Sequence, residues 1–230
     1  MIDAASFPAT LAQLEARIAA ACTKANRPRT SVQLLAVSKR QPVEAIRIAY
    51  ANGLRAFGEN YAQELRDKHV ECADLQGLRW HAIGPVQTKN AKYIAKAAHV
   101  FHALEKLEVA QALADRREGT PLDCFVEVNV GGEASKAGLA PSAVEAFVAQ
   151  VRALPQLRVV GLMTLPPPDG DPRPHFRALA ALAKTLGLQE LSMGTTGDFE
   201  AAIEEGATVV RVGTALFGER PKPAAAATAP

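Results

Sequence analysis

Short apolar stretches alternate along the chain with segments in which apolar residues recur every three or four positions. The stretches are rich in aliphatic, β-branched or aromatic residues and show little polar alternation, which is typical of strands buried on both faces. We therefore expect eight strands, at residues 34–38, 56–60, 79–84, 100–104, 124–130, 159–165, 190–194 and 209–213.

Helical spacing fills the intervals, for example at residues 42–53, 143–155, 176–187 and 199–206. A repeated strand and helix predicts a parallel sheet covered by helices. Eight such units in 230 residues fit a single (β/α)8 TIM barrel of the α/β class. A doubly wound open sheet is the structural alternative, but the GxGxxG fingerprint is missing after the first expected strand.

The two ends of the chain differ from the repeating unit. Thr10 and Gln13 predict a capping box, and the helix that follows should cover the outside or bottom of the barrel. Its expected apolar face consists of Leu11, Leu14, Ile18 and Cys22. The last ten residues, 221–230, are low in complexity, so we expect one domain over residues 1–220 and a disordered tail.

The composition narrows the function classes. The chain is 48% hydrophobic and 22% charged with a net charge of +2, as in an ordinary soluble protein. We expect a cytoplasmic protein with no membrane partner, because it has neither a membrane-length apolar run nor a signal-peptide pattern. Only 5% of residues are aromatic and no basic stripe occurs, which argues against nucleic-acid binding. Three cysteines without a CxxC pair indicate neither disulfides nor a metal site.

Polar residues gather where the expected strands end, which is where TIM barrels carry their chemistry. Period-two alternation places Lys39 and Arg211 on the inward faces of the first and last strands, which are neighbours in a closed barrel. Two cations without an obvious carboxylate partner call for an anionic ligand. The candidates are Lys39, Glu59, Asn60, His81, Asn129, Thr164, Gly194, Thr195, Thr196, Arg211, Gly213 and Thr214.

The segment MGTTGDFEAAIEEG, residues 193–206, predicts a seat for a phosphate group. A glycine-bearing loop enters a helix there, and its amides at 195–197 can bind an anion. Gly213 and Thr214 add donors after the last strand, at the usual phosphate position of these barrels. Lys39, beside another cation and partly withdrawn from water, becomes a nucleophilic amine suited to Schiff-base formation. Together these features indicate pyridoxal 5′-phosphate rather than a sugar phosphate.

Each residue also has a simpler interpretation. Lys39 could be a solvated charge at a strand end, and Thr195 and Thr196 could cap the helix that follows. His81 is as readily a hydrogen-bonded core histidine as a ligand contact. Arg211 is harder to explain in this way, because an unpaired buried guanidinium is costly. We interpret the helix surface LRDKHVE at 65–71 as solvated, and the following histidines as structural or exposed: His69, His99, His102 and His175.

Seven collinear motifs between about residues 10 and 220 resemble those of the pyridoxal phosphate homeostasis proteins, the YggS/PROSC-like family. They are LLAVSK, FGENYAQE, WHAIGPVQTKN, VNVGGEASKAG, GLMTLPPP, LSMGTTGDFEAAIEEG and VVRVGTALFG. The resemblance implies the barrel of alanine racemase (fold type III of this cofactor's enzymes) with an extra N-terminal helix. It also implies that Lys39 holds pyridoxal phosphate as a Schiff base and that Arg211 faces the pyridine nitrogen. The other implied contacts are Thr196, Gly213 and Thr214 with the phosphate, and Asn60 and His81 with the ring.

The sequence departs from the usual family pattern in a few places. Ala82 stands where phenylalanine is common, and Thr195 and Thr196 stand where methionine and serine are common. Threonine preserves the hydroxyl at position 196. We expect the lost bulk at 82 and 195 to loosen packing around the cofactor without removing the phosphate donors.

Three hypotheses of function follow. The first, which we favour, is a monomeric, non-enzymatic carrier of pyridoxal phosphate with cofactor-dependent apoenzymes as recipients. The second is a cofactor-dependent amino-acid racemase, and the third is a cofactor-free Schiff-base aldolase. Related racemases append a domain with a catalytic tyrosine, whereas this chain ends about seventeen residues after its last expected strand, so we expect no such domain. Lys136 is a second amine near the mouth, either a solvated loop residue or a transient acceptor of cofactor.

Overall fold

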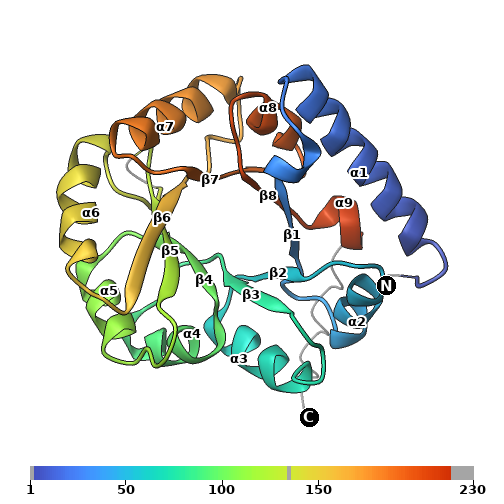
Figure 1. Ribbon diagram of the computed structural model, residues 1–230, viewed down its shortest axis with the longest axis horizontal. Coiled ribbons are helices and arrows are strands. Elements are labelled where there is room, and N and C mark those ends of the chain that lie inside the picture. Colours follow the sequence, from blue (N-terminus) through green and yellow to red (C-terminus); the bar gives the residue numbers. More distant parts are fainter. Residues whose placement is uncertain (1–2, 134–135, 219–230) are drawn as a thin grey trace, which may run out of the picture.

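The computed structural model describes residues 3–133 and 136–218 and forms a closed barrel of parallel strands surrounded by helices (Figure 1). The strands follow one another around the ring in chain order, so the predicted fold class is confirmed. They are β1 (Gln33–Val37), β2 (Ala56–Glu59), β3 (Arg79–Ala82), β4 (Val100–Leu104), β5 (Leu122–Glu127), β6 (Leu157–Met163), β7 (Glu190–Thr195) and β8 (Val209–Val212).

Helices form the outer layer of the barrel (Figure 1). The α-helices are α1 (Phe7–Lys24), α2 (Val43–Ala51), α3 (Ala62–Glu71), α4 (Ala91–Ala97), α5 (Leu107–Ala114), α6 (Val144–Arg152), α7 (Arg173–Thr185), α8 (Phe199–Glu204) and α9 (Thr214–Phe217). Short 3₁₀ turns occur at η1 (Arg29–Ser31), η2 (Thr88–Asn90) and η3 (Pro141–Ala143).

The predicted bounds of two strands are shifted. β5 and β6 each begin and end about two residues earlier than the apolar runs indicate. The first residues of both strands include a charged pair, Asp123 and Arg158, which lie opposite each other and form an ion pair at 2.6 Å. Because this pair is polar, the hydrophobic pattern alone assigns it to the preceding loops.

The expected N-terminal helix is present, but the predicted capping box is wrong. α1 begins at Phe7, and Thr10 lies inside its first turn, where its hydroxyl donates to the carbonyl of Ser6. Pro8 suits the first turn because it needs no amide partner there. Phe7 anchors the start by stacking on Phe217 of α9, with ring centroids 6.3 Å apart. The helix packs on the outside of the barrel against α8 and α9 (Figure 1).

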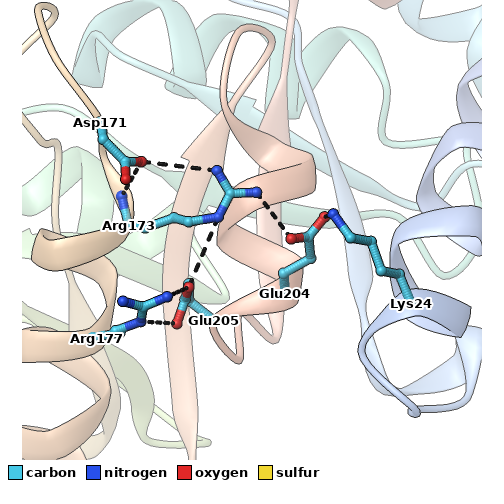
Figure 2. Close-up of polar contacts among 6 residues, drawn as sticks. All are labelled: Lys24, Asp171, Arg173, Arg177, Glu204 and Glu205. Atoms are coloured by element: carbon cyan, nitrogen blue, oxygen red, sulfur yellow. Dashed lines mark hydrogen bonds and ion pairs between the residues drawn. The ribbon is translucent and has the colours of Figure 1, made fainter.

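A group of charged side chains joins α1, α7 and α8 on the outer surface (Figure 2). Lys24 and Arg173 both bind the carboxylate of Glu204, at 2.8 and 2.9 Å, and Arg177 binds Glu205 at 2.7 Å. We call this group, completed by Asp171, the surface network. It fastens the extra N-terminal helix to the helical layer of the barrel.

The predicted disordered tail at residues 221–230 lies outside the described residues. Within the part of the chain that the structure covers, no helix combines the length and the apolar character needed to cross a membrane.

Candidate functional site

Lys39 lies in the turn that follows β1, beyond the last strand residue, Val37. Its Nζ donates to Oδ1 of Asn60, which follows β2, at 3.4 Å. The preceding Ser38 is fully buried, and Arg40 adopts a φ of +59°, in the left-handed region that non-glycine residues rarely occupy. The structure therefore brings two of the predicted site residues together in a tightly constrained turn.

Arg211 lies deeper in the barrel than the turn that carries Lys39. β1 and β8 pair in parallel with Leu35 opposite Arg211, and Lys39 follows Leu35 by four residues, beyond the end of the strand. Lys39 thus lies further toward the carboxyl end of the barrel than Arg211. A ligand contacting both would have to reach into the barrel from its mouth.

The guanidinium of Arg211 is held by neutral groups. It is 5% exposed, and its terminal nitrogens donate to Oγ of Ser192 at 2.6 Å and to the carbonyl of Thr164 at 2.9 Å. Burial lowers the pKa of Arg211 to about 10, against the attraction of Asp198 and Glu127, so the group stays cationic at neutral pH. Among the described residues neither carboxylate forms an ion pair with it. A buried cation in neutral contacts favours a nearby electron-rich ligand atom.

A chain of hydrogen bonds crosses the barrel from β3 to β8. His81 Nδ1 lies 2.9 Å from His102 Nε2, and His102 Nδ1 lies 2.8 Å from Ser192 Oγ, which also accepts from Arg211. Since β4 and β7 are not neighbours, the contact between His102 and Ser192 must run through the interior. Neither residue is among the site candidates expected from the sequence. His102, interpreted there as structural or exposed, is fully buried, and alternation along β4 places it on the same face as Val100 and Leu104.

The two histidines of this hydrogen-bonded chain are uncharged. Burial lowers the pKa of His81 to about 3 and that of His102 well below its usual range, so both rings are neutral at pH 7. A hydroxyl has one proton and two lone pairs, so Ser192 can accept from Arg211 and can either donate to His102 Nδ1 or accept from it. The protons can therefore be arranged along the chain in either direction. His81 Nε2 is buried and without a partner in the described part of the protein, and it is a donor in one arrangement and an acceptor in the other.

A second group missed from the sequence is Glu127, the last residue of β5. Phe125, two residues earlier on the same face, stacks on His102 with ring centroids 4.5 Å apart, so Glu127 also faces inward. Burial and the nearby Glu105 raise the pKa of Glu127 to about 7. Glu127, at the mouth of the barrel, is therefore partly protonated at neutral pH.

The loop after β7 partly matches the predicted phosphate seat. The amide and hydroxyl of Thr195 both donate to Oδ1 of Asp198, at 2.5 and 2.8 Å, so they are already engaged. The amides of Thr196 and Gly197 make no hydrogen bond to another described residue. Gly194 has φ +90°, and a Cβ there would lie 2.6 Å from the Cβ of Ala202 in α8, so only glycine allows this turn. The loop thus has a constrained geometry and two amides without a partner among the described residues.

The turn after β8 completes the predicted group. Gly213 precedes α9, and its carbonyl accepts the amides of Leu216 and Phe217. A Cβ at position 213 would lie 3.3 Å from the carbonyl of Val37 in β1, which makes the approach of these neighbouring strand ends tight. Thr214 follows directly as the first residue of α9.

The remaining candidates support loops at the mouth. Asn129 donates through Nδ2 to the carbonyl of Glu133 at 2.8 Å, and the buried Thr164 hydroxyl donates to the carbonyl of Val128 at 2.8 Å. Lys136 forms an ion pair with Glu133 at 3.4 Å and also reaches the carbonyl of Pro166. Lys136 is therefore a partly covered loop residue in this structure.

The interpretation of Ala82 from the sequence needs correction. His81 faces the barrel interior, so alternation turns Ala82 to the opposite face. It is 2% exposed and belongs to the apolar core of the protein. The small side chain at this position therefore affects packing against the outer layer rather than around an interior ligand.

The segment 65–71, which the sequence pattern indicates to be a solvated helix surface, contains a buried lysine. Lys68 is 5% exposed, and its Nζ donates to Glu59 at 2.8 Å and to Glu64 at 2.7 Å. It also donates to the carbonyl of Ser38 at 2.7 Å. We call Ser38, Glu59, Glu64 and Lys68 the Lys68 cluster. Glu59, the last residue of β2, is nearly fully buried. From the sequence it is only one of several polar candidates at the strand ends.

A pocket of about 510 Å³ opens beside this mouth, with Asn60 on its edge. It lies between the segments that follow β2, β3 and β4 and includes Lys89, Glu105 and Lys106. Asn60 therefore links the turn of Lys39 to an open cavity.

Comparison with known proteins gives consistent results. The family described as alanine racemase, N-terminal domain, matches residues 10–221. A pyridoxal phosphate homeostasis protein of Pseudomonas aeruginosa is 46% identical over 217 residues, covering 91% of this chain and 94% of that protein. The protein of the same name from Escherichia coli is 38% identical over 222 residues, covering 91% of this chain and 95% of its own length.

Solved structures agree with this relationship. PipY of Synechococcus elongatus with PLP bound has a TM-score of 0.76 and 34% identity, covering 89% of this chain and 99% of that chain. An alanine racemase of Corynebacterium glutamicum has a TM-score of 0.62 and 20% identity, covering 90% of this chain but 61% of the racemase. The second likeness concerns the barrel fold alone.

Proposed function

The chain belongs to the pyridoxal phosphate homeostasis protein family, whose barrel is that of the alanine racemase N-terminal domain, and from this premise we propose that it binds pyridoxal 5′-phosphate on Lys39. We further propose that it carries or regulates this cofactor in the cell as a monomer, without substantial catalysis, and delivers it to cofactor-dependent apoenzymes. The observation that supports the proposal most directly is the buried Arg211, cationic and held by neutral groups, on the strand that pairs with the one preceding Lys39.

The residues present fit this cofactor. Its phosphate needs hydrogen-bond donors, and the amides of Thr196 and Gly197 are free of other described partners. Gly213 and Thr214 lie at the end of the neighbouring strand and would complete the seat. His81 Nε2 is a further buried ring nitrogen without a described partner. Gly194 and Thr195 would shape the phosphate loop, and Thr195 would do so through Asp198, because its amide and hydroxyl already donate to that carboxylate.

The bound cofactor would supply an electrophilic aldehyde, to which an amine adds with loss of water. Lys39 would provide that amine, and Asn60 would orient it through the hydrogen bond at 3.4 Å. Arg211 would donate a hydrogen bond to the pyridine nitrogen. Because a guanidinium does not release its proton, that nitrogen would stay unprotonated. An unprotonated ring is a weak electron sink, which favours carriage over carbanion chemistry.

Two of the three tyrosines lie away from the barrel mouth, which favours a carrier over a racemase, because a racemase would require a second acid or base there. The Tyr50 hydroxyl donates to the carbonyl of Gln76, away from the barrel mouth. The Tyr93 ring lies 4.8 Å from the guanidinium of Arg66 on the outer helices. Tyr61 is 44% exposed and its hydroxyl accepts from Arg40.

The decisive experiment is chemical mapping of the bound cofactor. Purified protein incubated with pyridoxal phosphate and reduced with borohydride should carry a pyridoxyl adduct on Lys39 by mass spectrometry. Lys39→Ala should lose both this adduct and the visible absorbance, whereas Lys136→Ala should keep them. An adduct found mainly on another lysine, with the absorbance retained in Lys39→Ala, would disprove the assignment of Lys39.

Two further measurements separate the carrier from the alternatives. Thr196→Ala should weaken retention of the cofactor on gel filtration without lowering the thermal midpoint. Chiral analysis after incubation with several amino acids should show no substantial racemisation, while mixing with an apoenzyme should restore that enzyme's activity. Fast racemisation would instead favour the racemase hypothesis.

A further inference from the structure

Lys68 of α3 binds three acceptors from three different segments. Its Nζ donates to the carbonyl of Ser38 at 2.7 Å, to Glu59 at 2.8 Å and to Glu64 at 2.7 Å. An ammonium group has three N–H donors, so all of them are used. A buried lysine is rarely found without such partners. The cluster therefore joins the end of β1, the end of β2 and helix α3 at one point.

The cluster fixes the chain on both sides of Lys39. On the preceding side, the carbonyl of Ser38 is held as described, and its hydroxyl donates to Glu59 at 2.6 Å. On the following side, the backbone amide of Arg40 donates to Glu64 at 2.6 Å. Lys39 is the single residue between these two anchored neighbours.

The turn itself is not one that the chain adopts easily. Arg40 has a φ of +59°, and such a conformation in a residue other than glycine persists only where surrounding contacts impose it. The turn closes through the amide of Gln41, which donates to the carbonyl of Ser38 at 3.0 Å. Glu64 supplies the contact at the strained residue, so its carboxylate sets the direction in which the chain leaves Lys39.

We propose that Glu59, Glu64 and Lys68 are positioning residues that aim the amine of Lys39 into the barrel. The proposal rests on the assignment of Lys39 as the cofactor lysine. None of the three residues needs to touch the cofactor, because each acts through the backbone or side chains of Ser38 and Arg40. The role is specific to covalent attachment, since the groups proposed to hold the phosphate come from β7 and β8.

The sharpest test is Glu64→Ala. This change frees the amide of Arg40 but leaves the buried pair of Glu59 and Lys68 intact. The Glu64 side chain is 21% exposed, so water can enter its place and the protein should fold. Glu64→Gln keeps an oxygen that accepts the same hydrogen bonds and serves as the conservative rescue. Glu71→Ala removes an exposed carboxylate from the same helix and serves as the matched control.

Two ligands separate positioning from binding. The rate of covalent attachment is followed by the absorbance change with pyridoxal 5′-phosphate, and pyridoxamine 5′-phosphate, which has no aldehyde, reports non-covalent affinity. Glu64→Ala should slow attachment by about tenfold or more, because small displacements of a reacting group are costly. Its affinity for pyridoxamine phosphate should change less than about twofold, while Glu64→Gln and Glu71→Ala should attach at the wild-type rate. Equal losses with both ligands, or an unchanged attachment rate, would overturn the proposal.

A readout without cofactor tests the same claim. Hydrogen exchange by mass spectrometry should show faster exchange in the peptide covering residues 38–41 for Glu64→Ala than for Glu71→Ala. Unchanged exchange there would show that Glu64 does not hold the turn. Failure of the proposed function looks different: Lys39→Ala would then retain the absorbance change, whatever happens in the Glu64 variants.

Discussion

The Lys68 cluster and the surface network each contain a lysine–glutamate ion pair of the same length, but the two pairs lie in different environments. The ion pair of Lys68 and Glu59 is 2.8 Å long with side chains 7% and 0% exposed. The ion pair of Lys24 and Glu204 is also 2.8 Å long, yet Lys24 is 68% exposed (Figure 2). Geometry alone would rate the two pairs as equals.

The difference lies in what happens when one partner is lost. A buried charge left without its partner cannot be solvated, so breaking a buried pair is strongly destabilising. An exposed charge regains water and counterions, so the pair contributes little. The locations differ accordingly. The buried cluster holds the turn of Lys39, whereas the surface network holds α1 against the outer layer.

The largest expected effect comes from Lys68→Met, which removes the ammonium and keeps the length of the side chain. Glu59 would remain buried without a cation, so we expect the free energy of unfolding to fall by about 3–5 kcal/mol. Urea unfolding monitored by circular dichroism measures this loss. The double variant Glu59→Gln/Lys68→Met removes both charges and should recover much of it. A loss no larger than that of Lys24→Met would mean that burial does not distinguish the two regions.

The second-largest difference should appear in how stability depends on pH. The pKa values of Glu59 in the cluster and Glu204 in the surface network are shifted in opposite directions. Burial raises the pKa of Glu59 from 4.5 to about 7, with Lys68 opposing the shift. Hydrogen bonds from Lys24 and Arg173 lower the pKa of Glu204. The folded state therefore binds the Glu59 proton more tightly than the unfolded chain, and releases the Glu204 proton more easily.

The signs follow from proton linkage. Between pH 4.5 and 7 the wild type should lose stability relative to Glu59→Gln as pH rises, by at most about 1.4 kcal/mol per pH unit. Relative to Glu204→Gln, the wild type should instead lose stability only as pH falls below 4.5, and by less. Unfolding free energies of the three proteins at several pH values test both signs. Parallel curves for Glu59→Gln and wild type would contradict the raised pKa.

The same contrast explains which features could be predicted from the sequence. The eight strands can be predicted from apolar runs, because a strand covered on both faces consists mainly of apolar residues, and such a run is visible in the local sequence. Barrel closure follows from the eight expected strands, and it makes β1, which precedes Lys39, a neighbour of β8, which carries Arg211. The candidate site and the roles of its residues stay predictions until the cofactor experiments are done.

The contacts that fix those residues could not be predicted in this way. Lys68 lies in a polar segment of α3. Its burial depends on Glu59 of β2 and on the carbonyl of Ser38, 30 residues away. His102 and Ser192 are 90 residues apart and meet only because the barrel closes around them. Such long-range polar partners leave no periodic signal, so a local pattern interprets the residues as solvated or merely structural.

Loss of a buried uncharged group should lower the stability by an amount between the losses expected for the two regions. Ser192→Ala removes from the interior of the barrel the hydroxyl that accepts from Arg211 and is hydrogen-bonded to His102. Buried polar groups left without partners cost about 1–3 kcal/mol, so we expect a loss of that size in urea unfolding. Ser192→Thr, which keeps the hydroxyl, is the control for loss of the hydrogen bonds. If both variants lose the same amount, packing rather than hydrogen bonding decides the stability at this position.

The smallest effect should come from Lys24→Met, which makes the same chemical change as Lys68→Met in the surface network. Arg173 still binds Glu204 at 2.9 Å after the substitution, and Lys24 is largely solvated, so we expect a loss below about 1 kcal/mol. At 1 M salt the Debye length falls to about 3 Å, and the remaining difference from wild type should vanish. Lys68→Met should keep most of its loss at that salt concentration, because counterions do not reach the buried cluster. A loss in Lys24→Met that salt leaves unchanged would show that packing of the lysine stem, rather than its charge, fastens α1 to the barrel.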